Sequence, residues 1–176
     1  THMIRHILKA QGHKVGVIGT VHIMIGDTTY PIHNTTPDVV DLQHILHQMV
    51  QENVEYCVME VSSHALALGR VSGVEYDTAV FTNLTQDHLD FHKTFENYLA
   101  AKCKLFEQVS KSNQVKSGKG AVINIDDAYG HRVVEKTTAP IITYSIDGSG
   151  TLNAHDVDMT PKSSRYTVSY DGHDYT

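Results

Sequence analysis

The sequence of 176 residues contains no tryptophan, only two cysteines and four prolines, and no long uninterrupted apolar stretch. Two cysteines cannot form a disulfide framework, and both Cys57 and Cys103 lie in apolar contexts, which indicates a reducing compartment. A membrane-spanning helix needs about 20 consecutive apolar residues, and the first residues do not resemble a signal peptide. These absences predict a cytoplasmic protein.

An excess of positive charge is also missing, because the formal net charge is −6 at pH 7. This balance predicts no nucleic-acid or membrane partner. With 40% hydrophobic and 19% charged residues, the composition is that of a globular protein. The length suits one domain with a substantial core, or one domain and part of another. The 13 histidines raise the question of a metal site, but their scatter favours surface and packing roles.

Short apolar runs alternate with stretches of helical periodicity along the chain. This alternation predicts an α/β fold, with a mostly parallel sheet, helices on both of its faces and a C-terminal antiparallel strand pair. We expect helices over residues 1–11 and 37–51, from about 94 to 110, and up to about 136. We expect strands at 15–18, 56–59, 79–81, 121–123 and 141–144, a hairpin over 23–32, and the antiparallel pair at 152–157 and 165–170.

The most unusual side chain of the predicted helices is a lysine. On a helix that begins near Thr94, the apolar residues Phe95, Leu99 and Phe106 share one face, and Lys102 falls in the middle of the same stripe. The side chain can reach water while its stem packs, as most such lysines do. The alternative is a buried functional lysine that is held neutral or is modified, because burial lowers the pKa of a lysine.

Polar residues follow the predicted strands directly. Gly19 and Thr20 follow the strand 15–18, and Glu60 comes after the strand 56–59. Residues 83–88 follow the strand 79–81, and Asn124 follows the strand 121–123. Open α/β sheets bind ligands at the carboxyl ends of their strands, and a carboxylate there is well placed to hold Mg²⁺. We therefore expect a nucleotide and metal cleft at one edge of a single sheet.

The segment Asn34–Asp38 reads as the start of a helix. Thr36 can be its N-cap and Pro37 its first residue. An equally good interpretation is that Asn34, Thr35 and the free amides of the helix start hold an anionic ligand. Arg70 is a candidate for binding a substrate carboxylate or phosphate, although a solvated surface role is commoner.

Three other patterns carry less weight. Residues 61–64 contain serine next to histidine, but adjacency in sequence does not make a proton relay, and there is no nucleophile-elbow motif. His88 and His92 have the spacing of two zinc ligands on a helix, without a third ligand in view. Residues 118–120, Gly-Lys-Gly, lack the spacing of a phosphate loop.

Four ordered motifs resemble the central domain of the Mur ligase family: NTTPD at 34–38, EVSSH at 60–64, FTNLTQDHLD at 81–90 and AAK at 100–102. The resemblance covers nearly the whole chain. It implies an ATP-dependent amide ligase that adds the third amino acid, diaminopimelate or lysine, to UDP-N-acetylmuramoyl-L-alanyl-D-glutamate. In this family ATP phosphorylates the carboxylate, and the incoming amine displaces phosphate from the acyl-phosphate.

The resemblance also assigns residues. Glu60 and His88 would be Mg²⁺ ligands, and Lys102 would be carbamylated and hold a second Mg²⁺. The residues matching UDP-sugar-peptide contacts are Asn34, Thr35, Thr36, Ser62 and Arg70, and those matching nucleotide contacts are Asn124 and Asp127. The implied cofactors are ATP and Mg²⁺. The implied partners are the muramoyl-dipeptide and a free amino acid, and we expect the protein to be a monomer.

The chain departs from the family pattern in three ways. We expect the family's phosphate loop immediately before Thr1, and we expect the N-terminal uridine-binding and C-terminal amino-acid-binding domains to lie outside this chain. Leu68 stands where some relatives carry a glutamine that touches the substrate. We therefore expect a fragment that is inactive alone. The alternatives are a sibling synthetase of the folylpolyglutamate or cyanophycin type, and a non-catalytic metal- or ligand-binding module.

Overall fold

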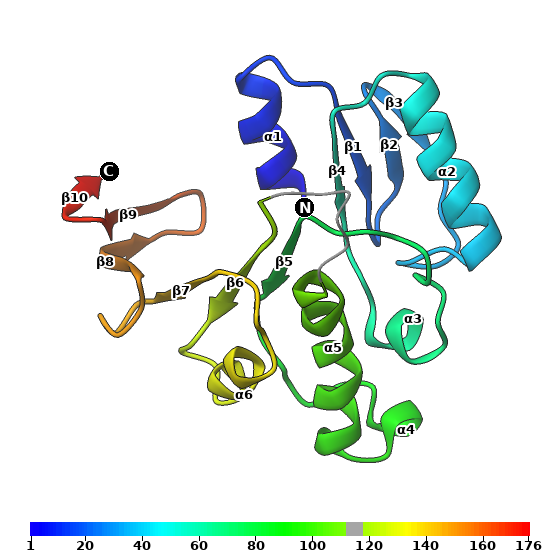
Figure 1. The fold of residues 1–176 in the computed structure, drawn as a ribbon. Coiled ribbons are helices and arrows are strands. Elements are labelled where there is room, and N and C mark those ends of the chain that lie inside the picture. The colour runs from blue at the N-terminus through cyan, green and yellow to red at the C-terminus, as the bar shows by residue number, and fades with distance from the viewer. Residues whose placement is uncertain (112–117) are drawn as a thin grey trace. The chain divides into compact units, whose positions relative to one another are not determined.

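A computed structural model describes residues 1–111 and 118–176. The chain divides into two compact units, Thr1–Val74 and Glu75–Thr176, and each is described by itself (Figure 1). Residues 112–117, between the helix expected to end near 110 and the strand expected at 121–123, lie outside the described residues. None of the helices in the described residues combines the length and apolarity that crossing a bilayer requires.

The first unit contains a four-stranded sheet with the strand order β3-β2-β1-β4. Strands β1 and β4 are parallel, and β1, β2 and β3 pair antiparallel in sequence. The predicted hairpin is confirmed, and Gly26 at its turn has a φ of 59°. The elements are α1 His2–Ala10, β1 Val15–Ile18, β2 Ile23–Ile25, β3 Thr28–Tyr30, α2 Val39–Gln51, β4 Tyr56–Met59 and α3 Ser63–Ala67.

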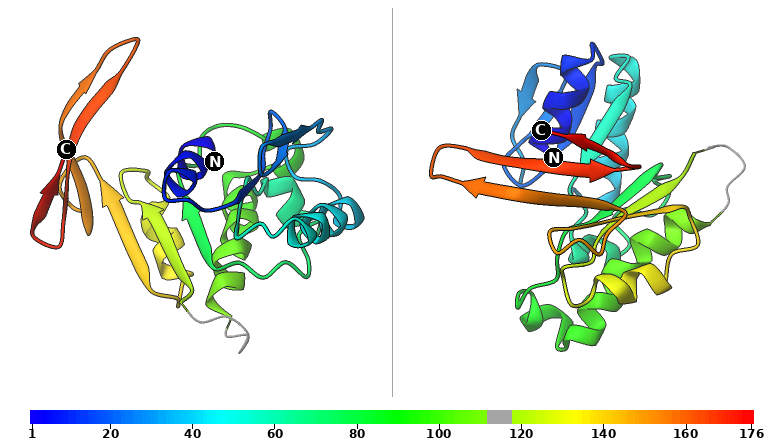
Figure 2. Two further views of the ribbon diagram at one scale, coloured as in Figure 1. Left: turned by 90° about the horizontal axis from the view of Figure 1, so that it is seen from above. Right: turned by 90° about the vertical axis from the view of Figure 1, so that its left-hand side faces the viewer.

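Helices cover both faces of this first sheet. Every residue of β1 is buried, as expected for a strand covered on both sides. Met49 of α2 lies against Gly16, where an added Cβ would come within 2.6 Å of its sulfur atom. Helix α1 lies on the opposite face from α2 (Figures 1 and 2). The expectation of helices on both sides of a sheet therefore holds in this unit.

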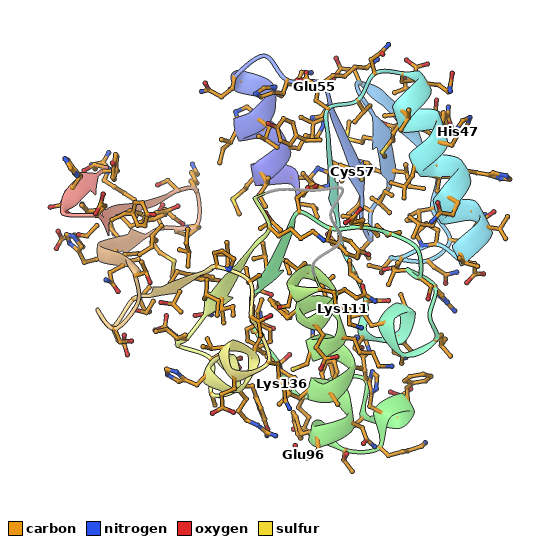
Figure 3. The ribbon with its side chains drawn as sticks, viewed as in Figure 1. His47, Glu55, Cys57, Glu96, Lys111 and Lys136 are labelled. Carbon is orange, nitrogen blue, oxygen red and sulfur yellow. The ribbon has the colours of Figure 1, made fainter. Side chains whose placement is uncertain are left out.

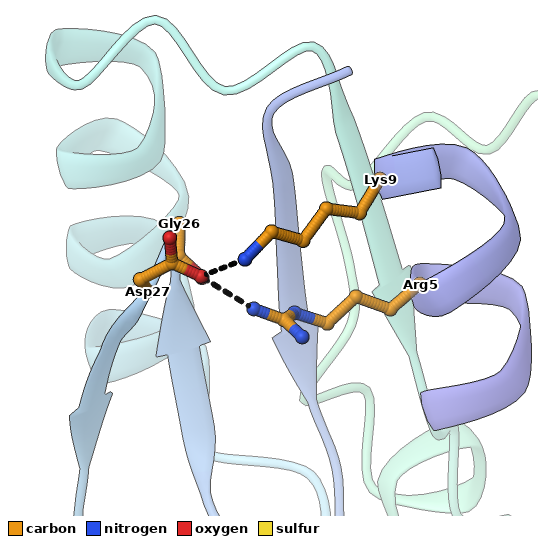
Figure 4. Close-up of polar contacts among 4 residues, drawn as sticks. All are labelled: Arg5, Lys9, Gly26 and Asp27. Atoms are coloured by element: carbon orange, nitrogen blue, oxygen red, sulfur yellow. Dashed lines mark hydrogen bonds and ion pairs between the residues drawn. The ribbon is translucent and has the colours of Figure 1, made fainter. Parts of the chain in front are cut away.

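Two cations of α1 bind the turn of the hairpin. Arg5 donates from Nη2 to the carbonyl of Gly26 at 2.9 Å and to Oδ1 of Asp27 at 3.0 Å, and Lys9 reaches the same Oδ1 at 2.5 Å (Figure 4). Both cations lower the pKa of Asp27, Lys9 more strongly through its hydrogen bond. These contacts tie the helix to the β2–β3 turn.

The second unit contains a six-stranded sheet with the order β10-β9-β8-β7-β6-β5. Strands β5 to β8 are parallel, and β8, β9 and β10 are antiparallel, so the predicted C-terminal pair is part of the main sheet. The long β8–β9 hairpin is clear in Figure 2. The elements are β5 Thr78–Phe81, α4 Leu89–His92, α5 Phe95–Ser110, β6 Gly120–Asn124, α6 Gly130–Glu135, β7 Ile141–Ser145, β8 Leu152–Met159, β9 Ser164–Tyr170 and β10 His173–Tyr175.

Helix α5 provides much of the core of this unit. Its buried Phe106 meets Phe81 of β5 edge to face, with ring centroids 6.3 Å apart. The helix begins where the sequence predicts, because the hydroxyl of Thr94 accepts a hydrogen bond from the amide of Asn97 at 3.1 Å. On the surface, Nη1 and Nη2 of Arg132 in α6 donate to the carboxylate of Glu96 at 2.8 and 2.7 Å. Glu96 lies on the first turn of α5 (Figure 3).

Two predictions about the sheet are wrong. We expected the strands to form one sheet, but they divide between two, with β4 at the end of one and β5 at the end of the other. We also expected the apolar run 56–59 to be buried on both faces, yet Tyr56 is 44% exposed. The position of β4 at the end of its sheet explains the exposure of Tyr56, because such a strand has a neighbouring strand on one side only.

The start of α2 also differs from the prediction. Asp38, not Thr36, is the N-cap, and its side chain accepts no hydrogen bond from the amides of the helix. The hydroxyl of Thr36 is instead bonded to the segment after β4. The short elements α3, α4 and β10 were not predicted, since each is too brief to show periodicity. Both cysteines are free, as expected.

Candidate functional site

Glu60 is held at the carboxyl ends of two parallel strands. Because Ile18 is in register with Met59, the residues that follow β1 and β4 lie side by side. The carboxylate accepts hydrogen bonds at Oε2 from the amide (3.0 Å) and hydroxyl (2.7 Å) of Thr20, and at Oε1 from the hydroxyl of Thr1 (3.0 Å). The predicted meeting of these two strand ends is confirmed.

The surroundings of Glu60 favour its charged form. Partial burial alone would raise the pKa of the carboxyl, but the hydrogen bonds from Thr20 and Thr1 outweigh burial and hold the pKa below its usual value. Gly19 makes room for the carboxylate, since a Cβ at this position would lie 2.9 Å from Oε1. Glu60 is therefore an anion at neutral pH.

Thr36 fixes the backbone on either side of this carboxylate. Its side chain is buried, and Oγ1 donates to the carbonyl of Glu60 at 2.8 Å and accepts from the amide of Ser62 at 2.9 Å. Ser62 in turn caps α3 by accepting from the amide of Ala65 at 3.2 Å. The hydroxyl of Thr35 lies 3.2 Å from that of Thr20.

Arg70 forms an ion pair in the first unit. Its Nε lies 2.9 Å from Oδ1 of Asp38, the N-cap of α2, and the arginine side chain is 27% exposed. The guanidinium therefore already has one carboxylate partner within its own unit.

Lys102 lies on α5 in the second unit, with Nζ 5.2 Å from the centre of the Tyr98 ring. Burial lowers the pKa of the amine, while the charges of Asp127 and Asp87 act in the opposite direction without cancelling the effect. The anomaly in the sequence thus corresponds to a partly buried lysine over an aromatic face.

His88 introduces α4 with a φ of 57°, in the left-handed region that few residues other than glycine adopt. Its Nδ1 lies 3.4 Å from Oδ1 of Asp87, and its ring meets that of Tyr98 edge to face at 5.8 Å. His92 is buried and stacked on the same tyrosine, with centroids 5.1 Å apart.

The zinc interpretation of His88 and His92 gains no support. Across residues 1–111 and 118–176, no group of three or more His, Cys, Asp or Glu side chains is arranged to hold a metal ion.

Asn124 and Asp127 join the loops at the ends of β5 and β6. The amide group of Asn124 donates to the carbonyl of Thr82 at 2.8 Å. The carboxylate of Asp127 accepts from the amide of Leu84 at 2.9 Å through Oδ2 and from that of Tyr129 at 2.9 Å through Oδ1. Both side chains therefore have structural bonds in addition to any contact with a nucleotide.

Comparison with known proteins decides the family. The Mur ligase middle domain family matches residues 1–176. The chain belongs to the Mur ligase family. It is 47% identical over 168 residues to the UDP-N-acetylmuramoyl-L-alanyl-D-glutamate–2,6-diaminopimelate ligase of Bacillus cereus. The aligned region covers 96% of this chain and 34% of that relative. It is 50% identical over 161 residues to the ligase of the same name from Geobacillus thermodenitrificans, covering 92% and 33%.

A solved structure of a UDP-N-acetylmuramoyl-L-alanyl-D-glutamate–2,6-diaminopimelate ligase has the same fold. It superposes with a TM-score of 0.83 at 28% identity, over 99% of this chain and 35% of the other. This Mur ligase chain therefore spans about a third of the length of the relatives that it matches.

The predicted site residues of this Mur ligase chain divide between its two units. The first unit holds Asn34, Thr35, Thr36, Glu60, Ser62 and Arg70, and the second holds His88, Lys102, Asn124 and Asp127. Sequence reasoning missed two residues. Thr20 was noted as a strand end without a role, and Tyr98 was overlooked although its spacing from Lys102, one helical turn, could have shown the contact.

Proposed function

We propose that this chain is the middle domain of an ATP-dependent ligase that joins 2,6-diaminopimelate to UDP-N-acetylmuramoyl-L-alanyl-D-glutamate. The observation that carries the proposal is the likeness to ligases of that name at 47% and 50% identity over nearly the whole chain. The N-terminal uridine-binding and C-terminal amino-acid-binding domains would lie outside it. ATP, when bound, supplies the phosphoryl group that activates the substrate carboxylate for amide formation.

The surroundings of Glu60 fit a role as a Mg²⁺ ligand. Magnesium prefers oxygen ligands and takes only one or two carboxylates, keeping several waters. Glu60 offers an ionised carboxylate beside the hydroxyl of Thr20.

Lys102 and His88 are the proposed metal ligands of the second unit. A lowered pKa leaves more of the Lys102 amine neutral. The neutral amine is the form that adds carbon dioxide, giving a carbamate anion and releasing one proton. Oδ1 of Asp87 lies 3.4 Å from Nδ1 of His88 and would favour a proton on that nitrogen, which is the tautomer that binds a metal through Nε2.

Substrate and nucleotide contacts follow the same proposal. Asn34, Thr35, Thr36, Ser62 and Arg70 would face the UDP-sugar-peptide, directly or by shaping the loop that does. Because the hydroxyl of Thr36 is committed to two backbone groups, its contribution would be to hold the loop. Asn124 and Asp127 would order the loops beside the nucleotide in the same way.

A chimaera tests the proposal. Residues 1–176 replace the matching segment of the Bacillus cereus ligase, and phosphate release is measured with ATP, Mg²⁺, the muramoyl-dipeptide and diaminopimelate or lysine. We expect release that requires both the dipeptide and diaminopimelate, the amino-acid requirement coming from the C-terminal domain of the Bacillus cereus ligase. In the same chimaera, Glu60→Ala, His88→Ala and Lys102→Ala should each reduce turnover by at least about 100-fold.

The matched control is Lys104→Ala, which removes an exposed lysine from the same helix and should leave turnover unchanged. Circular dichroism and gel filtration show whether each variant is folded. A folded chimaera without dipeptide-dependent phosphate release would refute the proposed function. Wild-type turnover in Lys102→Ala would refute the role of the carbamate while leaving the ligase assignment in place.

A further inference from the structure

One aromatic side chain of the second unit contacts both proposed metal ligands. Tyr98 is only 5% exposed. The amine of Lys102 lies over its ring, 5.2 Å from the centroid, and the imidazole of His88 meets it edge to face at 5.8 Å with an interplanar angle of 80°. Lys102 on α5 and His88 at the start of α4 therefore contact the same ring.

The ring of Tyr98 is itself packed against a neighbouring side chain. His92 stacks on it with an interplanar angle of 14°. The side-chain amide of Asn97 donates to the carbonyl of His92 at 2.9 Å, and Thr94 caps α5. These bonds fix the corner between α4 and α5, so the orientation of Tyr98 is set by its own neighbours.

We propose that Tyr98 is a positioning residue for the ligation reaction: its ring sets where the imidazole of His88 and the amine of Lys102 lie relative to each other. This inference rests on the proposed function. The contacts to both side chains are made by the aromatic ring, so the proposal assigns the effect to the ring and not to the hydroxyl.

The chemistry of the ring suits a lysine that changes charge. The face of an aromatic ring attracts a cation, so it holds the ammonium form of Lys102. A carbamate is an anion and is not attracted by that face. After modification the ring therefore acts on Lys102 through the apolar stem of the side chain, which stays on the same face of α5, one turn from Tyr98.

The test uses the chimaera with Tyr98→Phe, which keeps the ring, and with Tyr98→Leu and Tyr98→Met, which remove it. The matched control is Phe95→Leu, because Phe95 lies on the same helix and stacks on Tyr129 at 5.9 Å. Turnover is measured together with the affinity for Mn²⁺ alone, followed by electron paramagnetic resonance, which reports on metal ligands without catalysis.

We expect Tyr98→Phe to stay within about 2-fold of wild type in kcat and in Mn²⁺ affinity. Tyr98→Leu and Tyr98→Met should each weaken Mn²⁺ binding and lower kcat by about 10-fold or more, as loss of a residue that orients metal ligands does. The KM for the dipeptide should stay within about 2-fold. Phe95→Leu should resemble wild type in all of these.

Two outcomes would overturn the inference. If a folded Tyr98→Leu or Tyr98→Met variant binds Mn²⁺ and turns over like wild type, the ring has no positioning role. If Tyr98→Phe loses activity to the same extent as Tyr98→Leu, the hydroxyl carries the effect. Failure of the proposed function is recognised separately, because the folded wild-type chimaera would then show no dipeptide-dependent phosphate release. Failure of the proposed metal ligands would show as unchanged Mn²⁺ binding in His88→Ala and Lys102→Ala.

Discussion

Replacing Thr36 by valine tests whether its hydroxyl organises the loop around Glu60. Valine has nearly the same shape, so the substitution removes one oxygen from a position that is 1% exposed. The carbonyl of Glu60 and the amide of Ser62 both lose their partner. An unsatisfied buried group costs about 1–3 kcal/mol. As both residues are only partly buried, we expect the free energy of unfolding to fall by about 2–3 kcal/mol.

The measurement is urea unfolding of the 176-residue chain, followed by circular dichroism, with amide hydrogen exchange at Ser62 as a local readout. Exchange at Ser62 should accelerate in Thr36→Val. The matched control is Thr35→Val, since Thr35 is partly exposed and its hydroxyl lies 3.2 Å from another hydroxyl, that of Thr20, and not from a backbone group that it would leave unpaired among the described residues. We expect a loss below about 0.5 kcal/mol there. Equal losses in the two variants, with unchanged exchange at Ser62, would refute the reasoning.

Two further predictions concern backbone space and a buried charge. Gly130→Ala should lower the melting temperature far more than Gly16→Ala. The new Cβ at position 130 would lie 2.1 Å from the backbone carbonyl oxygen of Asn124, whereas at position 16 it would meet the flexible end of the Met49 side chain, which can move. Equal shifts in melting temperature would contradict this reasoning. Lys102→Met should raise stability at pH 7, since the buried ammonium is disfavoured. The lysine's folded pKa lies below its unfolded value, so its penalty is full below the folded pKa and disappears as pH rises towards 10.5. Urea unfolding at pH 7 and pH 10.5 should show the difference shrinking, and a constant difference would contradict the assignment.

Much of the fold could be predicted because local patterns mark the longer elements. Helix α5 begins at Thr94 as expected, since its cap is a local hydrogen bond. The strands were found from their apolar runs, but the pattern of one strand does not reveal which edges pair. The division into two sheets, and with it the exposure of Tyr56, therefore could not be predicted.

The candidate site was predictable where it depends on strand ends. The contact between Thr20 and Glu60 follows from two parallel strands that end in register. Thr36 was wrongly predicted to cap α2. Its hydroxyl instead binds the carbonyl of Glu60, 24 residues away in the sequence, and the local sequence does not show this bond. Tyr98 was missed because aromatic residues on a buried helical face are ordinary core, and only the positions of its neighbours distinguish it.

The carboxylate of Asp127 ties two loops together. Because one oxygen binds the amide of Leu84 after β5 and the other binds that of Tyr129 before α6, a displacement of either loop pulls on the other. An engineer who grafts a new sequence onto one of these loops should therefore treat both as a single cassette and transfer Asp127 with them. Asp127→Asn would keep the shape but replace one acceptor with a donor, uncoupling one loop from the other.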